Sequence, residues 1–342
     1  MIRSTITFGV LLLAALVASW LDWTAEDSVD LEGQVVVLDG AASAISAVRW
    51  IGEETEATLT RRTDERGAYL WVEYNRWTLR KVQPEASDTG GTPETETERT
   101  ANKAVFKSAD KGQALLDSLS PLAAQRSLEV TEEAKLQDLG LSDPQSRIEI
   151  DRGDRTEVIE IGKEAYGTRD YYARHQSSGR IYLLDRELIQ PLKYARTRLP
   201  DRALFGMARA DLESAQVSAG GHSGMWVQRN ADDEKQARWA PKENPDAAAE
   251  QATTWIDKFI GLKGTQYADP SDPPANLEER FQVALSDGKV TTTITVSQVG
   301  PDGDWYASSE YTRGLMKLVR SGASGLGDDV VSLLTDQPGD AP

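Results

Sequence analysis

The sequence repeats a β-hairpin pattern at a constant spacing. Residues 147–161 alternate apolar and polar side chains on both sides of Gly153, and residues 282–296 do the same on both sides of Gly288. The matching apolar positions and glycines of the two segments are 135 residues apart. Alternation with a period of two is typical of β-strands, and glycine provides the backbone freedom of a tight turn. Such a duplication predicts two similar lobes in one chain.

Further matches occur in the same order along the chain. Arg76-Trp77 corresponds to Arg238-Trp239, and the helical spacing of apolar residues over 116–122 recurs over 256–262. Each copy therefore reads as three strands, a loop, a helix, a strand hairpin, a further strand and a closing helix. We expect an α+β fold with antiparallel hairpins and packing helices, because hairpins followed by helices do not build a doubly wound parallel sheet.

The repeat also sets the expected domain boundaries. We expect a first α+β lobe over residues 31–205 and a second over residues 206–335. Residues 83–102, within the first copy, are rich in Pro, Gly, Thr and Glu and contain no apolar residue beyond alanine. Such a segment buries too little apolar surface to offset the entropy of ordering it, so we expect a disordered acidic insertion there.

Several helix boundaries follow from local sequence. We expect Thr131 to cap a helix that ends at Leu139, with Gly140 in the left-handed conformation that terminates many helices. In the second copy we expect helices near residues 309–320 and 328–334.

The N-terminus carries a membrane signal. Residues 6–21 form an apolar run that follows Arg3 and precedes Asp22 and further acidic residues. With its flanks the run reaches the roughly 20 residues that a span requires, and its charges orient the N-terminus towards the cytoplasm. We expect residues 1–23 to be a single-pass anchor in a bacterial inner membrane, with the bulk of the chain in the periplasm. A cleaved signal peptide is the alternative.

Composition excludes several kinds of site and partner. The chain contains no cysteine, so disulfides, thiolate ligands, cysteine nucleophiles and lipoprotein anchoring are excluded. Its formal net charge of −17 disfavours nucleic acid and anionic lipid headgroups. We therefore expect no nucleic-acid partner.

Histidine and serine give weak signals for catalysis. His175 and His222 are the two histidines, and neither belongs to a zinc-binding motif, so we interpret both as surface-loop residues. Ser108 and Lys111 have the S-x-x-K spacing of penicillin-binding proteins but lack the accompanying Ser-Asp-Asn and Lys-Thr-Gly motifs. We interpret Ser108 as a helix N-cap instead.

Other motifs have structural interpretations. Residues 322–327 are rich in glycine but lack a Walker lysine, so we expect a flexible break before the last helix. The short acidic runs at 151–154 and 302–304 lack the ligands of a calcium loop, and we interpret them as hairpin turns. Most of the nine tryptophans should be core residues, with one or two free to line a sugar- or partner-binding face. We predict no catalytic residue, no cofactor-binding residue and no metal ligand.

Four short segments resemble one family. They are Leu139-Gly140-Leu141-Ser142-Asp143-Pro144, Ile159-Glu160-Ile161-Gly162, Tyr171-Tyr172-Ala173-Arg174 and Ile181-Tyr182-Leu183-Leu184. They look like a bacterial family of membrane-anchored domains of unknown function, which has one N-terminal membrane helix and duplicated α+β units. Members are often encoded beside gliding-motility-type ABC transporter components. The resemblance covers residues 48–204 well and the second copy weakly, and it brings no catalytic residue with it.

These observations lead to an expected function. The resemblance implies a non-enzymatic periplasmic accessory subunit, with a protein partner in an ABC-type export or gliding-motility-related assembly. The alternatives are a periplasmic module that binds cell-wall sugar and an envelope hydrolase with a carboxylate pair. Exposed aromatic residues in a groove between the lobes would favour sugar, a bare sheet edge would favour a protein, and buried carboxylates with raised pKa values would favour an enzyme.

Overall fold

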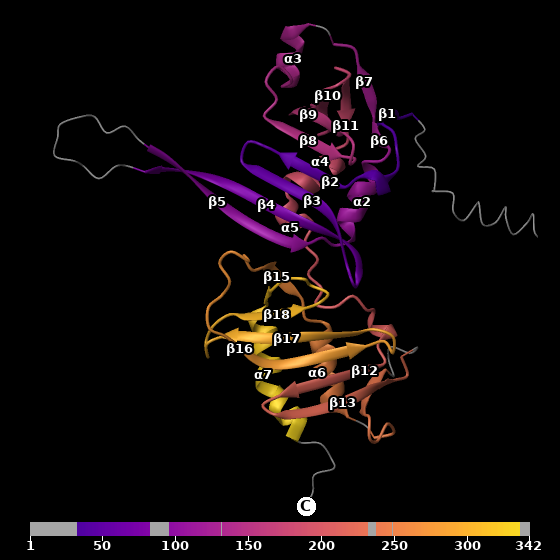
Figure 1. Ribbon diagram of the computed structural model, residues 1–342, viewed down its shortest axis with the longest axis vertical. Helices are drawn as coiled ribbons and strands as arrows, with labels where there is room; N and C mark the ends of the chain where they lie inside the picture. Colours follow the sequence, from indigo (N-terminus) through magenta and orange to yellow (C-terminus); the bar gives the residue numbers. More distant parts are fainter. Residues whose placement is uncertain (1–32, 83–95, 131, 232–236, 248, 336–342) are drawn as a thin grey trace, which may run out of the picture.

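The computed structural model describes residues 33–82, 96–130, 132–231, 237–247 and 249–335. These residues form two lobes stacked along the long axis of the molecule (Figure 1). Each lobe is built on one large antiparallel sheet with helices packed against it. A single buried apolar cluster includes side chains of both lobes.

The first lobe contains a nine-stranded sheet in the order β5-β4-β3-β2-β8-β9-β10-β11-β7. Its strands are β2 (Ala47–Ile51), β3 (Thr55–Asp64), β4 (Gly67–Val82), β5 (Glu96–Lys107), β7 (Arg126–Leu128), β8 (Ser146–Asp151), β9 (Thr156–Glu164), β10 (Tyr171–His175) and β11 (Ile181–Leu184). β1 (Val35–Leu38) and β6 (Leu122–Ala124) pair separately. β5 is therefore an edge strand of the large sheet.

Four helices belong to this lobe: α2 (Asp110–Ser118), α3 (Glu133–Leu139), α4 (Arg186–Lys193) and α5 (Ala195–Arg198). α4 contacts α2 and lies against β2 and β3. The Asp185 side chain caps α4 by accepting a hydrogen bond from the Glu187 N–H at 2.8 Å. α3 ends as predicted, with Gly140 in the left-handed region at φ 72°. The residue before α3 is Glu132, and the predicted cap Thr131 lies outside the described residues.

The second lobe contains an eight-stranded sheet in the order β14-β13-β12-β16-β17-β18-β19-β15. Its strands are β12 (Ser214–Ala219), β13 (His222–Arg229), β14 (Arg238–Pro241), β15 (Gly264–Tyr267), β16 (Leu277–Ser286), β17 (Thr291–Val299), β18 (Trp305–Ser309) and β19 (Met316–Leu318). Helices α6 (Glu250–Ile260) and α7 (Arg320–Thr335) contact each other, and α7 packs on β12, β13, β16 and β18.

If the edge strand β5 is left out, the first sheet has eight strands, in the order β4-β3-β2-β8-β9-β10-β11-β7. These correspond one to one, in the same order, to the eight strands of the second sheet. The repeated hairpins of the sequence occupy corresponding pairs, β8–β9 and β16–β17. Ile150 and Leu285, which are 135 residues apart, are both fully buried. Gly153 and Gly288 adopt φ values of 84° and 80° in the two turns, a conformation that favours glycine. Among the described strands of the second sheet, none corresponds to β5.

The predicted α+β class is wrong. About 44% of the described residues lie in strands and 22% in helices, so the fold is mostly β-sheet. One source of the error is the helix expected near residues 309–320, where Met316–Leu318 forms the short strand β19 and α7 begins only at Arg320. A strand of three residues is too short to give a recognisable alternation.

Two further predictions concern residues that lie wholly or partly outside the described ranges. The predicted anchor at residues 1–23 lies outside the described residues. Among the helices that the structure describes, none is long and apolar enough to cross a membrane. Of the predicted disordered insertion at 83–102, residues 96–102 belong to β5 instead, and residues 83–95 lie outside the described residues.

Candidate functional site

The two lobes meet at a nearly buried ion pair. Lys107 ends β5, and Asp201 lies in the segment that follows α5. Lys107 Nζ is 2.8 Å from Asp201 Oδ2, and the two side chains are only 11% and 13% exposed. Tyr311, from the second lobe, donates a hydrogen bond to the same carboxylate oxygen at 2.6 Å, and its ring centroid lies 3.3 Å from Lys107 Nζ. We call Lys107, Asp201 and Tyr311 the junction cluster.

Backbone groups hold this cluster in place. The Asp201 N–H donates to the Lys107 carbonyl at 2.9 Å, and the Tyr267 hydroxyl donates to the Asp201 carbonyl at 3.0 Å. Asp201 Oδ1 accepts a third hydrogen bond, from the Ala203 N–H. Each polar group of Asp201 therefore has a partner, as the burial of a charged group requires.

In the junction cluster, the charges of Lys107 and Asp201 stabilise each other. Burial lowers the pKa of the Lys107 ammonium, and the neighbouring Asp201 opposes that shift. Burial alone would raise the pKa of the Asp201 carboxyl, but hydrogen bonds from Lys107 and Tyr311 hold it below its usual value. A carboxylate with a lowered pKa is a poor general acid, so the cluster has the character of a structural junction.

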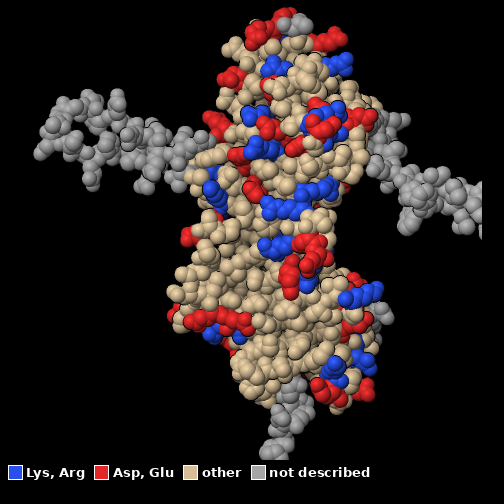
Figure 2. All heavy atoms as spheres, in the orientation of Figure 1, with Lys and Arg blue, Asp and Glu red and all other residues tan. Residues whose placement is uncertain are grey.

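A second set of contacts reinforces the junction. The turn between β3 and β4 reaches the second lobe, where Arg313 donates to both carboxylate oxygens of Asp64, at 2.5 and 2.8 Å. The Arg313 guanidinium also lies 4.0 Å from the centroid of the Tyr69 ring. Arg66 approaches Glu310 at 3.6 Å. On the face shown in Figure 2, charged side chains of both signs gather at the waist between the lobes.

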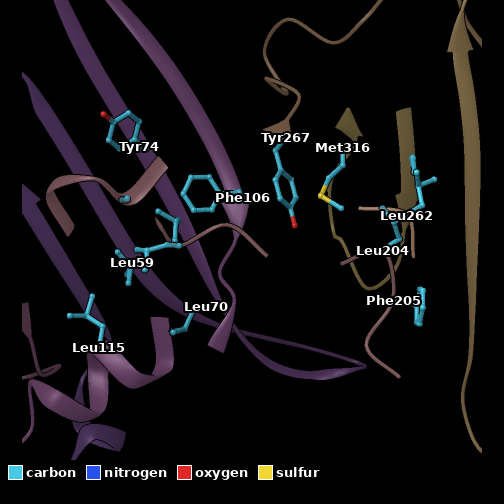
Figure 3. Close-up of a cluster of buried hydrophobic side chains, with 14 of the residues drawn as sticks. Leu59, Leu70, Tyr74, Phe106, Leu115, Leu204, Phe205, Leu262, Tyr267 and Met316 are labelled. Atoms are coloured by element: carbon cyan, nitrogen blue, oxygen red, sulfur yellow. The ribbon is translucent and has the colours of Figure 1, made fainter. Parts of the chain in front are cut away.

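An aromatic contact lies between the two edge strands at the junction. Phe106 on β5 and Tyr267 on β15 have ring centroids 6.2 Å apart. Figure 3 shows the two rings side by side, one from each lobe. Both side chains are buried, at 2% and 8% exposure. Phe106 and Tyr267 both line the cavity in the groove between the lobes.

A cavity of about 500 Å³ opens beside this aromatic contact. Residues of β5, α5, β15 and the segment around Pro200 line it. Its charged lining residues are Lys103, Arg196, Arg202 and Asp269, so basic groups outnumber acidic groups. The volume is within the usual range for a ligand pocket.

The outer edge of β5 borders this cavity. The Lys107 carbonyl accepts its hydrogen bond from Asp201 on the side away from β4. Because main-chain groups along a strand alternate between its two sides, those of Val105, Lys103 and Ala101 face the same outer side. In the part of the chain that the structure describes, no strand pairs with these three residues on that side.

The corresponding outer edge of the second sheet is covered. The Trp239 N–H on the edge strand β14 donates to the Thr253 hydroxyl of α6 at 2.9 Å. The same hydroxyl donates back to the Trp239 carbonyl at 3.3 Å. A helix side chain therefore pairs with the outward main-chain groups of Trp239 on β14, whereas no described strand pairs with β5 from Ala101 to Val105.

The S-x-x-K residues do not form a catalytic pair. Ser108 is buried beside a smaller cavity of about 290 Å³, and its hydroxyl donates to the Leu199 and Ala109 carbonyls. Lys111 is exposed on α2. The prediction that Ser108 caps this helix is wrong, because Ala109 occupies the N-cap position and α2 has no side-chain cap.

The interpretation of His175 as a surface-loop residue is wrong. His175 is 8% exposed at the end of β10, with Nδ1 3.0 Å from Ser178 Oγ and Nε2 3.0 Å from Glu157 Oε2. These contacts tie the turn between β10 and β11 to β9. His222 is exposed, as expected, at the start of β13.

The remaining motifs are structural. The glycine-rich residues 322–327 lie inside α7 rather than before it. Residues 151–154 include the last residue of β8 and the turn of the β8–β9 hairpin, where a turn was predicted. Five tryptophans are core residues: Trp50, Trp226, Trp239, Trp255 and Trp305. Across the described ranges, no group of three or more His, Asp or Glu side chains is arranged to hold a metal ion.

No sequence motif marks the junction cluster. Lys107 follows the apolar pair Val105-Phe106, and Asp201 follows Leu199-Pro200. A charged residue directly after apolar residues is a weak signal for a buried ion pair. Tyr311 carries no comparable signal.

Comparison with known proteins gives a family. The model of a family described as "Domain of unknown function (DUF4340)" matches residues 108–279, from the end of β5 to β16. No curated protein and no solved structure matches the chain. The matched region includes Asp201 of the junction cluster and the whole of β15. The chain belongs to the DUF4340 family of domains of unknown function.

Proposed function

We propose that this protein is a non-enzymatic interaction subunit that receives an extended segment of a protein partner in the groove between its lobes. The open outer edge of β5 beside the cavity carries the proposal. An extended peptide that joins a sheet edge gains main-chain hydrogen bonds, and adjacent cavities accept its alternate side chains. The junction cluster supports this role because it fixes β5 relative to the second lobe.

The proposal includes a cellular location and an assembly for this subunit. We place the protein in a bacterial inner membrane with its lobes in the periplasm, as an accessory of an ABC-type export or gliding-motility-related assembly. The apolar run at residues 6–21 supports the anchor, and the family resemblance supports the assembly.

The two alternative functions have less support at this groove. Sugar binding requires an aromatic face that is open to the ligand, and Phe106 and Tyr267 are buried against each other. A carboxylate-pair hydrolase requires an acid with a raised pKa, and the pKa of Asp201 is lowered.

Photocrosslinking of the full-length protein in its native membrane tests the proposal. A benzophenone side chain at Ala101, on the open edge, should crosslink a defined protein partner. The same probe at the exposed Glu133 on α3, at the far end of the first lobe, is the matched control and should not (Figure 1). Absence of a crosslink at Ala101, or equal crosslinking at both positions, would contradict the proposal.

A further inference from the structure

We propose that the cavity beside β5 binds carboxylate side chains, so that the partner segment is an acidic extended peptide. This inference rests on the proposed function, because the cavity and the edge of β5 would hold the same segment. The charge of the residues that line the cavity, their origin in different segments and their pairing support it.

Three basic side chains from different segments line the cavity beside β5. Lys103 lies on β5, Arg196 on α5 and Arg202 in the segment that leads to the second lobe. The chain as a whole has a net charge of −17, so an excess of basic groups at one cavity stands out from its overall charge. Such a cavity focuses a positive potential that attracts an anionic group.

These basic groups are available to a ligand. Lys103 and Arg202 are exposed, and neither forms a direct salt bridge with a residue that the structure describes. Lys103 lies near enough to Asp269 to contribute to the lowered pKa of that carboxyl, and Arg202 has no such acidic neighbour among the described residues. Arg196 donates one hydrogen bond to the Asn102 side chain at 2.7 Å, which positions its guanidinium at the cavity. Asp269, the acidic lining residue, already accepts hydrogen bonds from the Ser271 backbone and hydroxyl.

The neighbouring strand determines the form of the ligand. The main-chain groups of Lys103 face the open edge, so a peptide that pairs there runs directly past the cavity. Side chains on one face of a strand recur at every second residue. Acidic residues at alternate positions of the peptide would therefore face the cavity. Arginine binds carboxylates through paired hydrogen bonds, which suits this role.

Peptide binding to the full-length protein tests the inference. A fluorescent peptide of alternating Glu and Thr should bind, and a matched peptide of alternating Gln and Thr should bind at least roughly tenfold more weakly. The double variant Lys103→Glu/Arg202→Glu should lose the Glu-Thr peptide and gain binding to a Lys-Thr peptide. Arg238→Glu, at an exposed position on the far edge strand β14, is the control and should bind like the unmodified protein.

The outcomes separate this inference from the proposed function. Equal binding of the Glu-Thr and Gln-Thr peptides would overturn the inference. So would displacement of the Glu-Thr peptide by millimolar inorganic phosphate, because the cavity would then be a site for a free anion. If the partner still crosslinks to Ala101 at full yield in the Lys103→Glu/Arg202→Glu variant, the inference fails and the proposed function stands. If the unmodified protein gives no crosslink at Ala101, the proposed function itself fails.

Discussion

The two large sheets share one strand order and differ at one edge. The second sheet ends at β14, and the Thr253 hydroxyl covers the outer N–H of Trp239. The first sheet continues beyond the equivalent strand β4 with β5, whose outer side from Ala101 to Val105 pairs with no strand among the described residues. A protein normally covers or shortens a sheet edge, since an open one invites pairing with another chain. The shared strands therefore serve the fold, and the additional strand is the candidate for function.

The β4–β5 pair also extends beyond the shared sheet. β3 pairs with β4 only as far as Arg76, whereas the β4–β5 ladder continues to the Val82–Glu96 pair. Figure 1 shows this two-stranded ribbon projecting from the first lobe. A two-stranded ribbon is only marginally stable alone, and a third strand from a partner would stabilise it.

The largest expected effect comes from breaking the junction that positions the lobes. Lys107→Ala leaves the Asp201 carboxylate nearly buried without its cation, and we expect a loss of about 3–5 kcal/mol in the free energy of unfolding. Urea denaturation measures this loss. Lys107→Met/Asp201→Asn removes both charges and should recover most of the stability. A loss below about 1 kcal/mol for Lys107→Ala would show that the junction is not held by this pair.

The next prediction tests whether the shared frameworks are equivalent. Ile150→Ala and Leu285→Ala remove matching, fully buried side chains of the two sheets. Each should lower the free energy of unfolding by about 2–5 kcal/mol, because both leave a cavity in a packed core. Denaturant unfolding followed by tryptophan fluorescence checks this. A large loss for one variant and almost none for the other would show that the sheets are not equivalent.

A smaller effect distinguishes helix ends in the two lobes. Gly140 after α3 has φ 72°, and an added Cβ would lie 2.8 Å from Lys163 Cγ and 3.1 Å from its backbone nitrogen. We expect Gly140→Ala to cost about 1–2 kcal/mol. Gly261 after α6 has φ −74° and ordinary contacts, so Gly261→Ala is the matched control and should change stability by under about 0.5 kcal/mol. Thermal melting compares the two, and equal effects would refute the role of Gly140.

The smallest effect is a pH dependence at the lobe contact. Hydrogen bonds from Arg313 lower the pKa of Asp64 to about 2, from 3.8. A depressed folded-state pKa adds stability above pH 3.8, and this contribution disappears as the pH falls through 2. Asp64→Asn should therefore be less stable than the unmodified protein at neutral pH, and the difference should vanish near pH 2. Urea denaturation over this range checks it, and a difference that persists at pH 2 would contradict the assignment.

Local patterns were enough to predict some parts of the fold. The alternation around Ile150 and Leu285 and the turn glycines Gly153 and Gly288 depend on neighbouring residues, so the sequence reveals them. Residues 96–102 contain no apolar residue beyond alanine, a composition that favours a loop, yet they pair with β4 as a strand. Long-range pairing of this kind leaves no local signal.

The candidate site could not be predicted from the sequence, because its residues are also far apart in the chain. Lys107 and Asp201 are 94 residues apart, and Asp201 and Tyr311 are 110 residues apart. Neither separation matches the repeat, because the junction joins two different lobes rather than equivalent positions. The basic residues of the cavity also come from separate segments, and only the fold brings them together.

The central claim is that the open edge of β5 binds the partner, and one substitution tests it most directly. The Ala101 N–H faces the open side, so Ala101→Pro removes a donor for the partner without removing a hydrogen bond to β4. Ala101→Val keeps the N–H and is the control. We predict that pull-downs from the native membrane recover the partner with the valine variant and lose it with the proline variant, while both variants melt alike. Full recovery of the partner with Ala101→Pro would contradict the account.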